Sequence, residues 1–218
     1  MKLHPDGWPY IAISVALNAL LFALAGWWGF LLVPVSVWCI AFFRDPERAV
    51  PLGEGLIVSP ADGVLLPVVQ AAPPAELGMG DAPRTRLSIF MNVFNVHVNR
   101  VPAGGTVTAL SYRPGKFFNA SFDKASEHNE RMSIRLRMVN GAELAFVQIA
   151  GLVARRIRCD LRHDQQVHRG ERFGIIRFGS RLDVYLPADA AVKVVKGQKI
   201  VAGETVLAQF GKSQSDGG

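Results

Sequence analysis

The most restrictive feature of this sequence is a long apolar run near its beginning. Residues 9–43 read PYIAISVALNALLFALAGWWGFLLVPVSVWCIAFF and contain no charged side chain. The run is nearly twice as long as the ~20 residues that a single helix needs to cross a bilayer. Residues 26–29 (GWWG) divide it into two stretches of similar length, and Pro34 interrupts the second stretch. The run therefore predicts a helical hairpin with two tryptophans near its tip.

Basic residues flank the run at both ends, with Lys2 before it and Arg44 and Arg48 after it. Because positive charges favour the cytoplasmic side, both ends are expected there. Residues 1–48 are thus predicted to anchor the chain, as a peripheral or monotopic protein, to the cytoplasmic face of the cell (inner) membrane. The hairpin spans the bilayer or dips into one leaflet. A hairpin buried in a protein core is the alternative, whereas a signal peptide is excluded by the length of the run.

The rest of the chain carries an excess of positive charge. The formal net charge is +6, and residues 155–181 hold eight arginines against three acidic residues. Nucleic acid is not expected as a partner, because Phe173 and Phe178 are the only aromatic residues in this segment that could stack on bases. With a membrane anchor on the same chain, anionic membrane lipid is the expected partner. A solvated surface without a specific partner is the alternative.

No metal site or disulfide framework is expected from the sequence. Cys39 lies within the apolar run and is interpreted as a buried hydrophobic residue, and Cys159 stands alone. No histidine, cysteine or carboxylate cluster has metal-ligand spacing, and His163 and His168 are interpreted as loop residues.

From residue 49 to residue 211, short alternating segments separated by glycine and proline predict a mainly β domain, a barrel or sandwich. Asn140-Gly141 marks the clearest hairpin, within residues 131–151. Residues 71–83 are predicted to be a loop, residues 116–130 are the one candidate for a short helix, and residues 212–218 are predicted to be disordered.

Two segments resemble the half-repeats of lipoyl and biotinyl domains. They read SPADGVLLPV (59–68) and KGQKIVAGETVLA (196–208). The resemblance implies a barrel-sandwich architecture. It does not imply a carrier function, because the tight hairpin with a modifiable lysine between methionines is missing.

The segment 176–187, IRFGSRLDVYLP, places a Gly-Ser pair inside an apparent strand. Glycine weakens a strand and often marks a bulge or a strained turn. A serine in such a turn can attack the carbonyl of the preceding glycine and convert the peptide bond into an ester. Elimination of the ester and hydrolysis then release ammonia and leave a pyruvoyl group. A Gly-Ser pair on its own is usually an ordinary turn.

Four motifs give this pair its context. In order along the chain, they are VSPADG (58–63), FMNVFNVHVNRVP (90–102), EHNER (127–131) and FGSRLDVYLP (178–187). Together they resemble the phosphatidylserine decarboxylase family in its short bacterial and archaeal form, and the resemblance extends from the apolar anchor to Phe210.

The resemblance implies self-cleavage between Gly179 and Ser180. The products would be a β chain (1–179) and an α chain (180–218), which stay associated as a heterodimer on strands of one sheet, with a possible higher oligomer. Ser180 would become a covalent pyruvoyl cofactor that forms a Schiff base with the amine of phosphatidylserine. Carbon dioxide would leave, and phosphatidylethanolamine would be released as a product of phospholipid biosynthesis.

The resemblance also points to Asp62 and His97 as catalytic residues. Asp62 matches an aspartate of a self-processing triad in longer relatives, although an aspartate in an Ala-Asp-Gly sequence is by itself most often a turn former. His97 is the acid–base candidate, beside Asn95 and Asn99. Longer relatives carry a second histidine where Arg100 stands here. Either His97 serves both self-cleavage and decarboxylation, or self-cleavage proceeds without a histidine base.

His128, Asn129 and Glu130 match another stretch of the family and are expected either to line the site or to form a surface turn.

Two other functions are considered. A membrane-anchored barrel-sandwich adaptor without enzymatic activity would remain a single intact chain. A self-processing decarboxylase of a small amino acid would have no need for a long apolar anchor.

Overall fold

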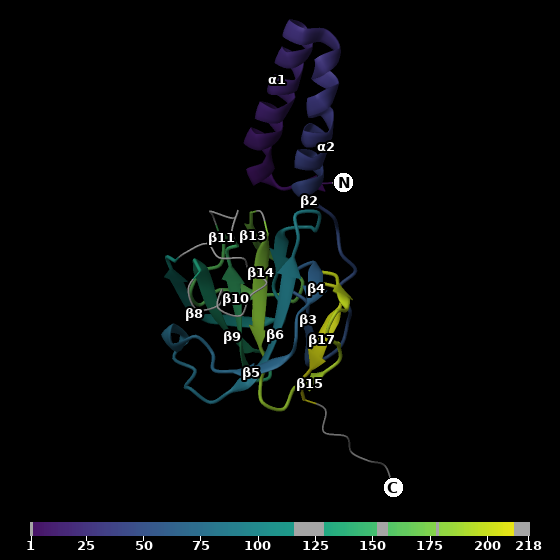
Figure 1. Ribbon diagram of the computed structural model, residues 1–218. Helices are drawn as coiled ribbons and strands as arrows, with labels where there is room; N and C mark the ends of the chain where they lie inside the picture. Colours follow the sequence, from purple (N-terminus) through teal and green to yellow (C-terminus); the bar gives the residue numbers. More distant parts are fainter. Residues whose placement is uncertain (1, 116–128, 152–156, 178, 212–218) are drawn as a thin grey trace.

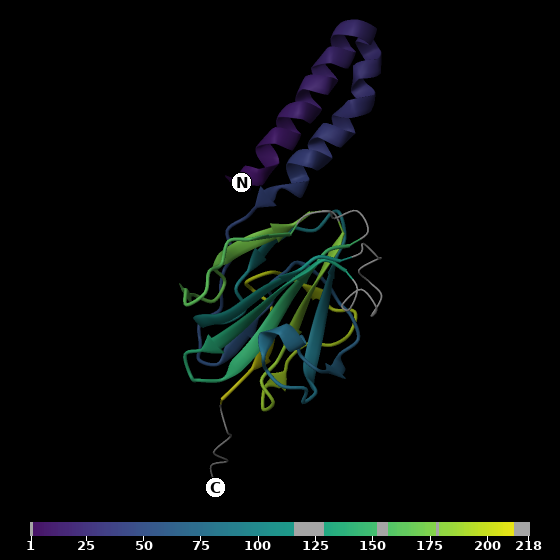
Figure 2. The ribbon, with the colours of Figure 1, turned by 90° about the vertical axis from the view of Figure 1, so that its left-hand side faces the viewer.

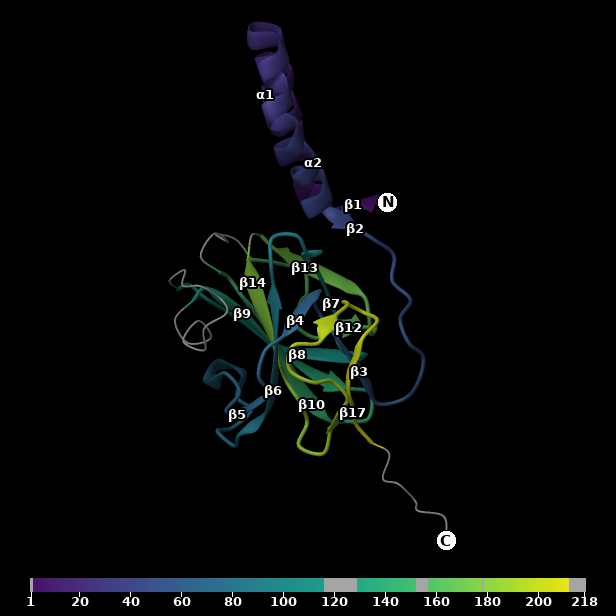
Figure 3. The ribbon, with the colours of Figure 1, turned by 45° about the vertical axis from the view of Figure 1, so that its right-hand side comes forward.

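A helical hairpin stands on one end of a β domain in the computed structural model, which describes residues 2–115, 129–151, 157–177 and 179–211 (Figure 1). The two arms of the hairpin lie side by side and extend away from the strands in each view (Figures 2 and 3). The predicted N-terminal helical hairpin and the mainly β domain are confirmed. The possible helix over 116–130 and the tail 212–218 fall largely or wholly outside the described residues.

The hairpin contains helices α1 (Trp8–Ala25) and α2 (Val33–Phe42), with 3-10 turns at Pro5–Gly7 and Gly26–Leu32. Gly26 ends α1 with a φ of 55°, a conformation that favours glycine. The Asn18 side-chain amide donates to the Gly29 carbonyl at 3.2 Å and closes the tip. Trp27 and Trp28 are 84% and 66% exposed there, as the sequence predicts.

The outer surface of the hairpin is apolar and uncovered. The stretch Pro5–Phe42 is long and apolar enough to cross a membrane, and only 6% of its most apolar window is buried. At 1.5 Å per residue, α1 is about 27 Å long, close to the ~30 Å thickness of the hydrocarbon core of a bilayer. The alternative of a hairpin buried within a protein core is therefore wrong for this chain.

The foot of the hairpin is packed into the β domain. Short strands β1 (Lys2–Leu3) and β2 (Arg44–Asp45) pair there. Phe42 and Phe43 are buried in a cluster with residues of the β domain, including Val98. The hairpin is thus attached through a hydrophobic contact and not through a flexible linker.

Most strands belong to one antiparallel sheet, which contains nine strands among the described residues. Its order is β12-β8-β9-β10-β14-β6-β4-β16, and β5 also pairs with β6. The strands of this sheet are β4 (Gly63–Leu65), β5 (Val69–Ala71), β6 (Arg84–Met91), β8 (Gly105–Arg113), β9 (Arg131–Met138), β10 (Glu143–Ile149), β12 (Gln166–Val167), β14 (Ser180–Tyr185) and β16 (Lys199–Ile200).

Two three-stranded sheets complete the domain, in the orders β11-β13-β7 and β15-β17-β3. Their strands are β3 (Leu56–Val58), β7 (Val98–Arg100), β11 (Ile157–Cys159), β13 (Arg172–Ile176), β15 (Ala191–Val192) and β17 (Val206–Gln209). The main core draws residues from all three sheets, for example Phe146, Phe173 and Leu207. This layered arrangement agrees with the predicted barrel-sandwich-like fold.

Residues 72–83 are a loop, in agreement with the prediction for 71–83 except that Ala71 is the last residue of β5, and the loop is packed onto the outer face of the large sheet. It contains a short 3-10 turn, Ala75–Leu77, which the sequence did not predict. Leu77 is 2% exposed and packs with Ala145 and Tyr185, and the Glu76 carboxylate binds Arg131 and Ser133.

The aromatic contact in the main core provides a test of the fold. Phe146 is fully buried and lies edge-to-face with Phe173, with ring centroids 5.1 Å apart. Phe146→Ala is expected to lower the free energy of unfolding by about 3–5 kcal/mol, because it leaves a cavity in a packed core. Urea unfolding in detergent measures the change. Val139→Ala is the control, since Val139 is 90% exposed; equal effects of the two substitutions would contradict this core.

Candidate active site

The chain crosses from one sheet to another at the Gly-Ser pair. Strand β13 ends at Ile176 in a three-stranded sheet, and β14 begins at Ser180 in the large sheet. The prediction that the pair lies inside a strand is therefore wrong. Gly179 has a φ of +65°, which is incompatible with a strand and available chiefly to glycine. Among the described residues, a side chain at this position would meet no atom within 4 Å, so the backbone conformation, and not crowding, calls for glycine.

Ser180 is the first residue of β14 and is completely buried. It pairs with Met91 of β6, and its Oγ lies 3.3 Å from the Met91 Sδ. A thioether sulfur is a weak acceptor, so this contact holds the hydroxyl only loosely. The Ser180 oxygen is therefore buried one residue after Gly179, and within the described part of the chain no strong hydrogen bond restrains it.

Two amide side chains span the strand that carries Ser180. Asn99, on the facing sheet, donates to the Met91 Sδ at 3.9 Å and accepts from the Gln148 Nε2 at 2.8 Å. Met91 and Gln148 belong to β6 and β10, the two neighbours of β14 in the large sheet. The Asn99–Gln148 pair therefore lies across β14 near its first residue.

The Gln148 Oε1 is buried and has no partner among the described residues. A free buried acceptor is costly unless something binds to it. Sequence reasoning named Asn99 only as a neighbour of His97 and missed Gln148 and Met91. A glutamine within the apolar run AFVQIA is the signal that could have pointed to Gln148.

His97 is fully buried at the foot of the hairpin, where its ring stacks on Phe42 with centroids 4.2 Å apart. Its Nδ1 lies 3.0 Å from the Asn95 carbonyl. Because a carbonyl only accepts, Nδ1 carries the hydrogen of the neutral ring and Nε2 presents a lone pair. That Nε2 is buried and unpartnered among the described residues. Burial lowers the pKa of His97 to about 4, so the ring is neutral at pH 7.

His97 and Ser180 are both fully buried, and no hydrogen bond joins them among the described residues. Asn99, two residues after His97 in the chain, contacts Met91, which in turn contacts Ser180. Strand β14 begins at the end of the β domain that carries the hairpin (Figure 1), and His97 stacks on Phe42 at the foot of that hairpin.

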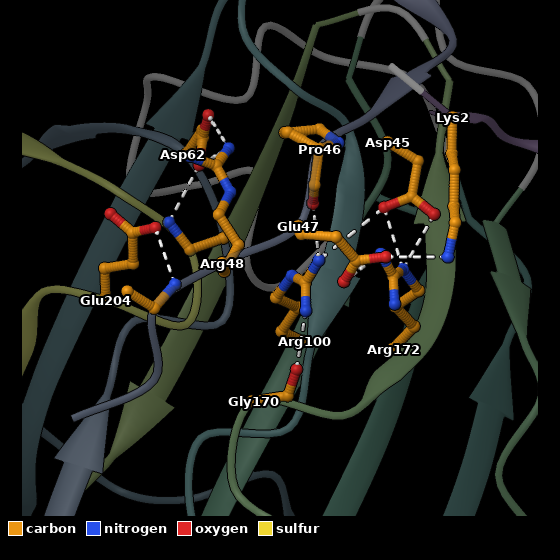
Figure 4. A network of polar contacts seen from close by, with 12 residues as sticks. Lys2, Asp45, Pro46, Glu47, Arg48, Asp62, Arg100, Gly170, Arg172 and Glu204 are labelled. Atoms are coloured by element: carbon orange, nitrogen blue, oxygen red, sulfur yellow. Dashed lines mark hydrogen bonds and ion pairs between the residues drawn. The ribbon is translucent and has the colours of Figure 1, made fainter. Parts of the chain in front are cut away.

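Asp62 is held by other groups. Its carboxylate accepts two hydrogen bonds from Arg48, at 3.0 and 2.8 Å, and one from the Ala202 amide at 2.7 Å (Figure 4). Among the described residues it makes no hydrogen bond with Ser180 or His97. Asp62 therefore ties the segment that leaves the hairpin to the β domain, in addition to any role in catalysis.

Arg100 also binds the segment that leaves the hairpin, and its guanidinium group can only donate hydrogen bonds. Its guanidinium donates to the carbonyls of Pro46 and Gly170, at 2.9 and 2.8 Å, and lies 3.6 Å from the Asp45 carboxylate (Figure 4). An arginine remains protonated in proteins and cannot act as a base. Arg100 stands where longer relatives have a second histidine, and in this chain it holds the backbone at Pro46 and Gly170 in place.

Asn129 and Glu130 are buried, so the alternative of a surface turn is wrong for these two residues. The Asn129 side chain donates to the Ala150 carbonyl at 2.7 Å, and the Ala150 amide donates to the Glu130 carbonyl at 2.9 Å. Ala150 directly follows Ile149, which pairs with Arg181. The two residues therefore lie close to the level of Ser180, whereas His128 lies outside the described residues.

Several arginines of residues 155–181 have partners within the chain. Arg158 and Arg177 both bind Asp6, Arg172 binds Asp45, and Arg181 binds Asp183. Arg169 donates to backbone carbonyls, including that of Pro51. Much of the charge that could attract anionic lipid therefore also holds the hairpin and the segment after it in place.

The buried His97 predicts a pH dependence of stability. The unfolded chain takes up a proton near pH 6.5, but the folded chain does so only near pH 4, so acid favours unfolding. Between pH 7.5 and pH 5 this one group is expected to remove about 2 kcal/mol of stability.

The His97→Gln variant is expected to lose about 2 kcal/mol less than the wild type over this range, as measured by urea unfolding at the two pH values. His168→Gln, which changes an exposed histidine, serves as the control. Identical losses in the wild type and His97→Gln would show that His97 is not buried as a neutral ring.

Comparisons with known proteins agree with this geometry. The family model for phosphatidylserine decarboxylase matches residues 35–208. A phosphatidylserine decarboxylase proenzyme of Paramagnetospirillum magneticum is 56% identical over 97% of this chain and 88% of its own length. Proenzymes of the same name from Rickettsia bellii and Rickettsia typhi are 53% and 50% identical, each over 98% of this chain and 92% and 93% of their own lengths. The chain belongs to the phosphatidylserine decarboxylase family.

Proposed function

We propose that this chain is a self-processing enzyme that decarboxylates phosphatidylserine to phosphatidylethanolamine with a pyruvoyl group made from Ser180. Family membership supports the reaction and the substrate. The observation that carries the mechanism is the buried Ser180 hydroxyl, loosely held by Met91 and directly preceded by Gly179 in a left-handed conformation.

The proposed self-cleavage uses groups that are already present where the chain passes from β13 to β14. The Ser180 oxygen attacks the Gly179 carbonyl carbon, the bond from that carbon to the Ser180 nitrogen breaks, and an ester forms. Loss of the Ser180 α-proton expels Gly179 as a carboxylate and leaves a dehydroalanine. Water then releases ammonia from the dehydroalanine and leaves a ketone. The Nε2 lone pair of neutral His97 is the proposed proton acceptor in this region.

The residues around Ser180 fit a pyruvoyl group. Position 180 is buried, and among the described residues its hydroxyl has only the weak contact with Met91. Because Ser180 is the first residue of β14, a new chain end can form there without breaking the strand pairing beyond it. A pyruvoyl group supplies an electrophilic carbonyl that draws electrons from the substrate as carbon dioxide leaves. His97 supplies or removes protons, and the free Gln148 oxygen can accept a hydrogen bond from an amine.

The two chains that result are proposed to remain one heterodimer. Strand β14 pairs with β10 over Arg181–Tyr185 and with β6 over Ser180–Tyr185. Later strands of the shorter chain also pair with the longer chain, β16 with β4 and β17 with β3. Cleavage before Ser180 leaves all of these pairings in place.

The hairpin is proposed to insert into the cell (inner) membrane, with the β domain on its cytoplasmic face. Its exposed apolar surface supports insertion, and its contact with His97 through Phe42 supports a candidate site beside the membrane. A substrate that resides in a bilayer then reaches Ser180 without leaving the lipid phase completely.

Replacement of Ser180 tests self-cleavage. The wild type should separate into two fragments that meet at Gly179/Ser180, the smaller beginning with a pyruvoyl group, whereas Ser180→Ala should remain whole. Intact mass spectrometry distinguishes the two forms. Purified wild type given phosphatidylserine in detergent micelles should produce phosphatidylethanolamine, and Ser180→Ala should produce none.

An uncut wild-type chain would contradict the pyruvoyl mechanism and favour a non-enzymatic adaptor. A processed chain that leaves phosphatidylserine unchanged but decarboxylates a soluble amino acid would contradict the lipid substrate alone.

His97 and Asp62 are expected to differ in their effect on self-cleavage. His97→Ala should slow cleavage by about 10²-fold or more, because it removes the buried proton acceptor. Asp62→Asn should slow it by less than about 10-fold, because its neighbours Arg48 and Ala202 still hold the turn. Pulse-chase gels of freshly synthesised chains give both rates. The reverse order would assign the base to Asp62.

A further inference from the structure

The turn between β6 and β7, residues 92–96, presents an exposed aromatic side chain beside the hairpin. Phe94 is 72% exposed, whereas Val96 of the same turn is buried in the cluster under the hairpin. A single exposed apolar residue is common on protein surfaces and carries little information by itself. The way in which this turn is held makes Phe94 informative.

The turn is stiffened by its own asparagines. The Asn92 amide donates to the Asn95 Oδ1 at 2.8 Å, and the Phe94 amide donates to the Asn92 Oδ1 at 2.9 Å. The Asn95 amide also donates to the Asn92 carbonyl at 3.1 Å. Phe94 is therefore displayed on a defined turn whose asparagine side chains accept hydrogen bonds from amides of the same turn.

The turn is tied to the hairpin at two points. The Trp38 Nε1 donates to the Val93 carbonyl at 3.2 Å, and an Arg44 guanidinium nitrogen donates to the Phe94 carbonyl at 2.8 Å. Trp38 precedes Phe42, at the end of α2, by about one helical turn, or ~5 Å along the axis. The turn thus reaches alongside the lowest part of the apolar hairpin.

The charges at this level suit an anionic lipid surface. Arg44 lies at the turn, and Arg177 approaches Tyr10 at the start of α1, with its guanidinium 5.3 Å from the ring centroid. Tryptophan, tyrosine and arginine are typical of the boundary between lipid headgroups and acyl chains. The exposed Phe94 continues this boundary from the hairpin onto the β domain.

We propose that Phe94 inserts into the headgroup–acyl boundary of an anionic membrane, as a second lipid contact beside the hairpin. The contact holds the 92–96 turn, and with it His97 directly after the turn, at the level of the lipid headgroups. This inference rests on the membrane anchoring proposed above, and the occupant is a lipid bilayer and not a protein partner.

Fluorescent labels on single introduced cysteines test the contact. Phe94→Cys, Trp27→Cys at the hairpin tip and Val139→Cys are labelled with an environment-sensitive dye and reconstituted into phosphatidylcholine–phosphatidylglycerol vesicles. Val139 lies in the turn that joins β9 to β10, at the opposite end of these strands from Ile149, which pairs with Arg181 beside Ser180. Labelled wild type corrects for Cys39 and Cys159.

The label at position 94 is expected to emit at shorter wavelength in vesicles and to be quenched by lipid that carries a nitroxide high on its acyl chain. The label at position 139 should do neither. A label at position 94 that behaves like the one at position 139, while position 27 is quenched, would overturn the Phe94 contact and leave the anchoring intact. Absence of quenching at all three positions would overturn the anchoring and the contact together.

Kinetics provide an independent readout. Phe94→Ser is expected to raise the KM for phosphatidylserine in vesicles by about threefold or more, because apolar area is lost from the lipid contact. It should leave kcat/KM for dispersed short-chain phosphatidylserine unchanged, and Phe94→Leu should retain wild-type behaviour. Equal losses on both substrates would show that Phe94 acts on the geometry of the site and would overturn the proposal.

Discussion

The position of β14 in the middle of the large sheet controls the rest of the candidate site. Both edges of the strand are paired, with β10 on one side and β6 on the other. Only its first residue, Ser180, lies where the chain arrives from another sheet. Gly179 can therefore adopt a left-handed conformation without breaking a ladder, and Ser180 is buried beside Met91. The peptide bond that is proposed to break is therefore the last one before the strand, and the strand beyond it is paired on both edges.

The second constraint is the contact between the hairpin and the β domain. Phe42 is the last residue of α2, and it packs on His97, one of the proposed proton carriers. This contact also excludes water from His97, which keeps the ring neutral at pH 7. A change in the position of the hairpin would therefore alter the surroundings of the His97 ring directly. The proposed membrane attachment and the proposed chemistry share the same few side chains.

Much of the fold could be predicted because it depends on local patterns. An uncharged run divided by glycines predicted the hairpin, and Asn140-Gly141 predicted the turn between β9 and β10. The Gly-Ser pair was found from four motifs in order. Its placement inside a strand was wrong, because alternation continues on both sides of the point where the chain changes sheets. A pattern with a period of two residues does not show which sheet each residue joins.

The sequence by itself determined that this chain has an apolar N-terminal hairpin, a mainly β domain and a Gly-Ser pair in the context of the phosphatidylserine decarboxylase family. Only the tertiary structure decided which side chains surround that pair. Gln148 reaches Asn99 from 49 positions away in the chain. Arg100 binds Gly170 and Pro46 instead of facing Ser180. Such contacts depend on how separate strands are stacked, and no local spacing in the sequence encodes them.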